Sequence, residues 1–176
     1  MRVSDRCAEY RALRDTIRER GTTRVWVFVA GLIGWAGLVI ATAALAALPV
    51  ATLLPLLVLA ALFEAVFALH TGVERIGRYL QVYFEDASRW EHVTMAYGRT
   101  FRSGADPLFT LVFIGAAILN FVPVLIAEPV AIEVAVIGFA HVLFIVRIAL
   151  ARREAGKQRA IDLERFEKLK IHAERQ

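Results

Sequence analysis

Residues 25–74 read VWVFVAGLIGWAGLVIATAALAALPVATLLPLLVLAALFEAVFALHTGVE and contain no lysine or arginine. The stretch holds two apolar runs separated by a short turn between Pro49 and Pro55. A helix rises about 1.5 Å per residue, so each run is about long enough to cross the roughly 30 Å hydrocarbon layer of a bilayer. This stretch therefore predicts two transmembrane helices joined by a tight turn.

Residues 103–146 repeat the pattern, with no lysine or arginine and a turn at Glu128-Pro129. All 21 lysines and arginines of the chain lie outside these two stretches, in residues 2–24, 75–102 and 147–175. Loops that stay in the cytoplasm are enriched in lysine and arginine. We therefore expect an all-α, polytopic membrane protein with both termini in the cytoplasm. Its four transmembrane helices are expected at about 25–48, 53–71, 107–127 and 130–150.

The composition agrees with a membrane protein and restricts its chemistry. Hydrophobic residues make up 58% of the chain, whereas the formal net charge is +4. Cytoplasmic loops are enriched in lysine and arginine, which anionic lipid headgroups attract, and this explains the positive charge of the chain. We therefore expect contact with headgroups and no nucleic-acid partner. The only cysteine, Cys7, excludes an internal disulfide, a CxxC redox pair and a four-cysteine zinc site.

The charged windows predict helical segments outside the membrane. Residues 1–24 are expected to form an amphipathic cytoplasmic helix that ends at Gly21. No proline interrupts the sequence after Pro55 until Pro107, so one long helix is expected over 53–97. The fourth span is expected to continue into a helical tail. The predicted organisation is thus an N-terminal helix 1–24, a transmembrane domain 25–151 with a cytoplasmic helix-loop 72–106, and a cytoplasmic tail 152–176. The third span is expected to begin at Asp106-Pro107, with the Asp106 carboxylate as N-cap and proline at the first helical position.

Ionisable residues inside a span are costly and are the default functional candidates. Counted from the outer ends of their helices, Glu64 lies roughly 18 Å deep and His141 roughly 17 Å deep. We therefore expect Glu64 and His141 to form an intramembrane pair if the second and fourth spans touch. Such a pair could relay a proton, or it could be a hydrogen bond that fixes helix register. Asn120 is a neutral companion in the third span.

A second group of polar residues lies where the second and fourth spans reach the inner interface. Its arginines could bind lipid phosphates or an anionic ligand, or they could form local salt bridges at a solvated helix exit. Glu85 and Trp90 continue this surface, and the aromatic content of 79–97 favours packing against the tail helix or a partner. The group comprises His70, Glu74, Arg75, Arg78 and Arg147.

The sequence predicts no metal or cofactor. His70 and His141 differ in depth by roughly 10 Å, which does not suit the two axial ligands of one haem. No thiolate or paired-histidine spacing accompanies them, as a zinc site requires. The sequence also shows no Ser/His/Asp catalytic set, no P-loop and no glycine-rich phosphate loop.

One short segment resembles a known family. Glu74-Arg75-Ile76-x-Arg78, followed by Glu85, is similar to the Glu-Arg-Val-x-Arg…Glu signature of the four-span, glutathione-dependent MAPEG enzymes. The resemblance implies a glutathione role for Arg75, Arg78 and Glu85. The likeness covers about a dozen residues, and the family's histidine and asparagine correspond here to Leu80 and Val82. The segment also follows the second span rather than the first, so we do not assign the chain to that family.

Three functions agree with these patterns. The first is a small inner-membrane protein of a bacterium that acts as a non-enzymatic scaffold or accessory subunit through its cytoplasmic helices. The second is an oligomer that conducts ions or protons along Glu64 and His141. The third is a lipid- or glutathione-directed enzyme at the cytoplasmic interface. We expect the first, with a protein partner or a second copy of the chain as its binding partner.

Overall fold

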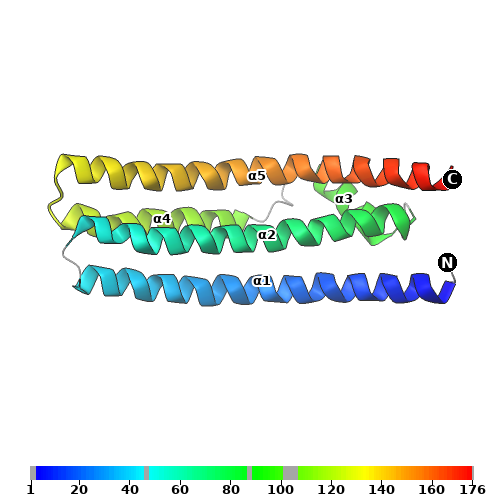
Figure 1. Ribbon diagram of the computed structural model, residues 1–176, viewed down its shortest axis with the longest axis horizontal. Helices are drawn as coiled ribbons and strands as arrows, with labels where there is room; N and C mark the ends of the chain where they lie inside the picture. Colours follow the sequence, from blue (N-terminus) through cyan, green and yellow to red (C-terminus); the bar gives the residue numbers. More distant parts are fainter. Residues whose placement is uncertain (1–2, 46–47, 87–88, 101–106, 176) are drawn as a thin grey trace. The chain divides into compact units, whose positions relative to one another are not determined.

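The computed structural model describes residues 3–45, 48–86, 89–100 and 107–175. Every element in these ranges is helical, and Figure 1 labels the five α-helices. In this part of the chain four helices are long and apolar enough to cross a membrane, which confirms the all-α class and the four predicted apolar helices. The elements are α1 (Val3–Leu45), the short 3-10 helix η1 (Pro49–Thr52), α2 (Leu53–Tyr83), α3 (Trp90–Thr100), α4 (Pro107–Ile126) and α5 (Ala131–Glu174).

The helices divide into two compact units that follow the charge pattern of the sequence. The first, called the apolar unit here, comprises Val25–Phe67 and Pro107–Arg152. The second, called the polar unit, comprises Met1–Arg24, Ala68–Asp106 and Arg153–Gln176. Because α1, α2 and α5 each extend from apolar into charged sequence, each of them contributes a segment to both units.

Aromatic side chains form the centre of the apolar unit. The Phe63 ring meets the edge of the Phe113 ring at a centroid distance of 5.2 Å and that of Phe144 at 6.0 Å. These contacts join α2 to α4 and α5, and edge-to-face geometry is favourable for aromatic rings. Gly31 brings α1 against the same core, because a Cβ atom at this position would overlap the Leu62 side chain.

The structure corrects the prediction that Gly21 ends the N-terminal helix. Helix α1 continues without interruption from Val3 to Leu45. A single glycine in a helix interior costs only about 1 kcal/mol relative to alanine, which neighbouring helical turns and tertiary contacts can offset. The predicted N-terminal helix and the first span are therefore one helix.

The prediction of one helix over 53–97 is also wrong. Helix α2 ends at Tyr83, and α3 begins at Trp90 after a turn in which the Arg89 N–H donates to the Asp86 carbonyl. The turn contains neither proline nor glycine. It is held instead by tertiary contacts of Glu85, described below. The predicted N-cap of α4, Asp106, lies outside the described residues.

Candidate functional site

In the apolar unit, Glu64 pairs with Arg147 and not with His141. Nη2 of Arg147 donates a hydrogen bond to one Glu64 carboxylate oxygen at 2.9 Å, and Nε lies 2.8 Å from the other oxygen in an ion pair. The guanidinium also lies over the Phe67 ring, 5.6 Å from its centroid. Both side chains are partly exposed on the surface of the unit, Glu64 by 47% and Arg147 by 37%.

His141 is buried and belongs to a separate polar cluster with Asn120. Its Nδ1–H donates to the Ile137 carbonyl at 2.8 Å, because a carbonyl can only accept. Its Nε2 then accepts from the Asn120 amide at 3.0 Å, and the same amide donates to the Thr52 carbonyl at 3.0 Å. Asn120 thus ties α5 and η1 to α4. Among the described residues its Oδ1 has no hydrogen-bond partner.

The expected Glu64–His141 pair fails because depth is only one coordinate of a helical residue. His141 and Arg147 are six residues apart, which corresponds to a rotation of about 600° and places them about 120° apart around α5. His141 therefore faces α4, whereas Arg147 faces α2. The side chain of Arg147 also points toward the N-terminal end of α5, as Cα–Cβ bonds in helices do. It therefore reaches back to Glu64 and does not join the inner-interface cluster.

The other residues of the predicted inner-interface cluster lie in the polar unit, where ion pairs connect α2 to α5. Glu74 pairs with Arg159 at 2.7 Å, and Arg75 pairs with Asp162 at 3.2 Å. The space that these side chains enclose is only about 10 Å³, roughly the room for one water molecule. An anionic ligand larger than water therefore does not fit between them.

His70 and Glu74 are brought together as the sequence predicts. His70 Nε2 lies 3.4 Å from the Glu74 carboxylate, and its Nδ1 accepts from Nη1 of Arg24 at 2.7 Å. Arg78 is buried and donates from Nη1 to the Gln81 side-chain oxygen at 2.8 Å. The cluster thus consists largely of contacts between helices of the same chain.

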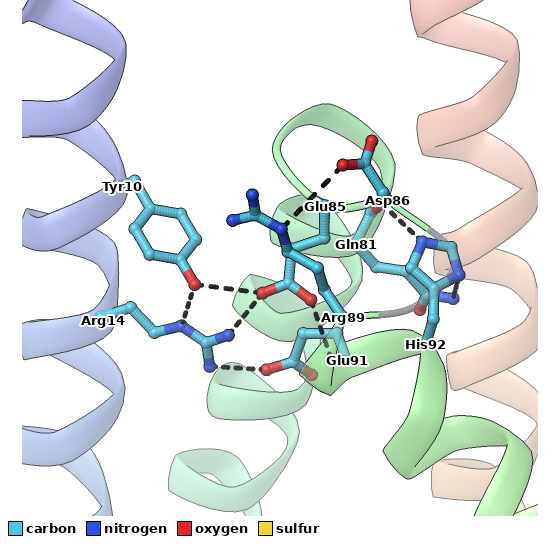
Figure 2. Close-up of polar contacts among 8 residues, drawn as sticks. All are labelled: Tyr10, Arg14, Gln81, Glu85, Asp86, Arg89, Glu91 and His92. Atoms are coloured by element: carbon cyan, nitrogen blue, oxygen red, sulfur yellow. Dashed lines mark hydrogen bonds and ion pairs between the residues drawn. The ribbon is translucent and has the colours of Figure 1, made fainter.

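The most connected group in the polar unit centres on Glu85 (Figure 2). Its side chain is only 1% exposed and forms an ion pair with Arg14 of α1. It also accepts from the Tyr10 hydroxyl at 3.2 Å and from the backbone N–H of Glu91 at 2.8 Å. The last bond caps an orphan N–H in the first turn of α3. Glu85 therefore fixes where α3 begins and joins it to α1.

Arg14 holds a second carboxylate as well. Its Nη1 lies 2.8 Å from Glu91, and its Nε donates to the Tyr10 hydroxyl at 3.1 Å. Burial alone would lower the pKa of Arg14, but the hydrogen bond with Tyr10 and the charges of Glu91 and Glu85 outweigh it and raise the pKa above its ordinary value. Arg14 is therefore a fixed cation between two acidic groups.

The sequence prediction missed this network, although it named Glu85. Tyr10 and Arg14 are four residues apart and hence share a helix face, which was the available signal on α1. An isolated glycine inside a helix, Gly77, was a second signal in the sequence. In the structure a Cβ atom at this position would lie 2.9 Å from the Glu91 carboxylate. A glycine at this position lets the Glu91 side chain lie against the backbone of α2.

His92 also turns toward α2 (Figure 2). Its Nε2–H donates to the Gln81 carbonyl at 3.1 Å, and its Nδ1 accepts from the Gln81 amide at 3.3 Å. The Gln81 side-chain oxygen is already occupied by Arg78, which orients the amide toward the imidazole. Both polar residues near the start of α3, Glu91 and His92, therefore face inward.

As a consequence α3 presents apolar side chains on its outer face. Trp90 is 69% exposed, Val93 53% and Tyr97 56%. Their spacing of three and four residues places them on one side of the helix. This arrangement is the reverse of an ordinary surface helix, whose apolar side faces the core. We call Trp90, Val93 and Tyr97 the α3 face.

Comparisons with known proteins give no assignment: no family model, no curated protein and no solved structure matches the chain. Within the described residues no group of three or more histidine, cysteine, aspartate or glutamate side chains could hold a metal ion.

Replacing Asn120 by leucine should destabilise the apolar unit. Asn120→Leu leaves the Thr52 carbonyl and His141 Nε2 buried without their donor, at about 1–3 kcal/mol for each unsatisfied group. We expect a clearly lower thermal unfolding temperature for the variant in detergent. Thr42→Val is the matched control, because among the described residues the Thr42 hydroxyl bonds only to the Leu38 and Val39 carbonyls of its own helix. Equal unfolding temperatures for the two variants would contradict the structural role of Asn120.

Replacing Arg14 by methionine should open the turn between α2 and α3. Arg14→Met leaves the buried Glu85 carboxylate without its cation, and removing one partner of a buried ion pair typically costs about 3–5 kcal/mol. Cleavage by trypsin after Arg89, in this turn, should accelerate by at least ~10-fold, since proteolysis follows the population of the open form. Arg18→Met is the control, because the Arg18–Asp15 pair is largely exposed. Unchanged protection of Arg89 in Arg14→Met would refute the network's role.

Proposed function

We propose that this protein is a multi-pass protein of a bacterial inner membrane whose polar unit lies in the cytoplasm and docks a protein partner on the α3 face. The observation that carries the proposal is the outward position of Trp90, Val93 and Tyr97. In this reading the four apolar helices anchor the chain, and the protein acts as a scaffold or accessory subunit without catalysing a reaction.

Exposed apolar residues are common, and single ones need no explanation. The α3 face differs because its three residues are neighbours on an eleven-residue helix and two of them are aromatic. Tryptophan and tyrosine are over-represented among the residues that dominate binding energy in protein interfaces. The face therefore has the composition of an interface centre.

The α3 face is also fixed in place before any partner binds. Glu91 is held by Arg14, and His92 is held by Gln81, so the inner side of α3 is anchored by polar contacts. An anchored helix loses less conformational freedom on binding than a mobile one, which favours affinity. The same contacts prevent α3 from turning its apolar side into the core.

Distance along α2 supports a protein partner over the lipid surface. The apolar part of α2 ends near Leu69, and Gly77, against which Glu91 lies, is eight residues further. This separation corresponds to about 12 Å along the helix, whereas the headgroup layer on one side of a bilayer is only about 5–7 Å thick. A partner that offers an apolar groove or the apolar face of a helix suits the α3 face best.

The geometry supports the alternative functions less well. Glu64 and His141 have separate partners, so the proton relay that motivated a conducting oligomer has no direct link between them. Glu74, Arg75 and Arg78, the candidates for an enzymatic or lipid-binding site, are engaged in contacts within the polar unit.

The proposal is tested with a photo-activatable amino acid at position 93 in the native membrane. We expect a discrete protein adduct that disappears when Trp90→Ala is added. The same amino acid at Leu169, which is 58% exposed in the polar unit, is the control and should give no such adduct. With the purified partner, Trp90→Ala should weaken binding by about 30-fold, the equivalent of roughly 2 kcal/mol. Adducts with lipid alone would overturn the proposal.

A further inference from the structure

The Glu64–Arg147 pair lies on the surface of the apolar unit, although Glu64 is near the middle of the second span and Arg147 near the inner end of the fourth. Charged groups in hydrocarbon are expensive, and within membrane proteins they almost always face the bundle interior or another polar group. Here Glu64 remains 47% exposed after pairing with Arg147. Something outside the described chain is therefore needed to keep lipid tails away from the pair.

The surface beside Glu64 allows another helix to come close. Ala61 and Ala65 are exposed on the same side of α2, one turn apart and next to the carboxylate. Small residues at this spacing let helix backbones approach in membranes, where packing replaces the hydrophobic effect as the driving force. The charge pair and the small residues are two separate features of one face.

We propose that a second copy of this chain packs on the face formed by Ala61, Glu64, Ala65 and Arg147, related to the first by a two-fold axis along the membrane normal. The face carries one negative and one positive charge side by side. A half-turn places each carboxylate opposite the guanidinium of the other copy, so both charges of both copies gain a second partner. Such self-complementarity is the property of an isologous interface.

Charge complementarity favours a second copy over other occupants. A partner helix with one charged residue would complement one member of the pair and repel the other. The outer side of α1 is the rival surface for self-association, since Ala30, Gly34, Gly37 and Ala41 are all exposed there. That stripe has small residues but no charged residue, so charge complementarity does not favour self-association there.

Disulfide cross-linking in membranes tests the interface. In a Cys7→Ser background, Ala61→Cys and Ala65→Cys should form disulfide-linked dimers under mild oxidation, because only residues close to the axis bring Cα atoms within about 7 Å. Ile118→Cys on α4, where Ile118 is 60% exposed, is the control and should remain monomeric. Ile33→Cys probes the rival surface on α1. Cross-linking at position 33 or 118 but at neither 61 nor 65 would overturn the proposal.

Charge reversal in two co-expressed copies distinguishes pairing between copies from pairing within one. Glu64→Arg alone and Arg147→Glu alone should each reduce the cross-linking of Ala65→Cys by at least ~10-fold, since like charges then meet across the axis. Co-expression of the two variants should restore a mixed dimer, because each charge of one copy then faces its opposite on the other.

Within each reversed copy the local pair stays repulsive, so a purely intramolecular role cannot give this rescue. Failure of the mixed dimer to form, with both variants present in the membrane, would refute the interface. The outcome is independent of partner binding on the α3 face.

Discussion

The absence of water in the hydrocarbon layer is the constraint on which the rest of this structure depends. A charged or hydrogen-bonding group inside the layer has to find its partner within the protein. The apolar unit obeys this rule in two places. Asn120 satisfies both His141 and the Thr52 carbonyl inside the bundle, and Arg147 neutralises Glu64 at its surface. All lysines and arginines of the chain lie outside residues 25–74 and 103–146.

The polar unit is organised by a different balance. The Tyr79 ring of α2 packs on the Phe166 ring of α5, and ion pairs such as Arg14–Glu85 and Arg75–Asp162 also join its helices. A buried carboxylate is stable only when cations and N–H groups surround it. Satisfying Glu85 in this way draws the polar side of α3 inward and leaves Trp90 and Tyr97 outside. The apolar α3 face is therefore a consequence of the buried charge network.

The architecture was predictable from the sequence because charge segregation and run length depend on the bilayer and not on packing detail. The predictions were wrong where tertiary packing determines the end of a helix or the partner of a side chain. Gly21 does not stop α1, and α2 ends at Tyr83 without a proline or glycine, because tertiary contacts override local propensity. For the candidate site, depth placed Glu64 and His141 at the same level, but the rotation of each helix selected other partners. Linear spacing contains no information on that rotation until one interhelical contact is known.

The central claim is that the apolar helices cross the membrane with the polar unit in the cytoplasm, and Cys7 offers the most direct measurement. Cys7 is exposed in the polar unit, so a maleimide that cannot cross membranes reports its side. Our account predicts no labelling of Cys7 in intact cells and full labelling after permeabilisation. In a Cys7→Ser background, Val50→Cys in the turn before α2 should be labelled from outside. Labelling of Cys7 in intact cells, with Val50→Cys protected, would contradict the account.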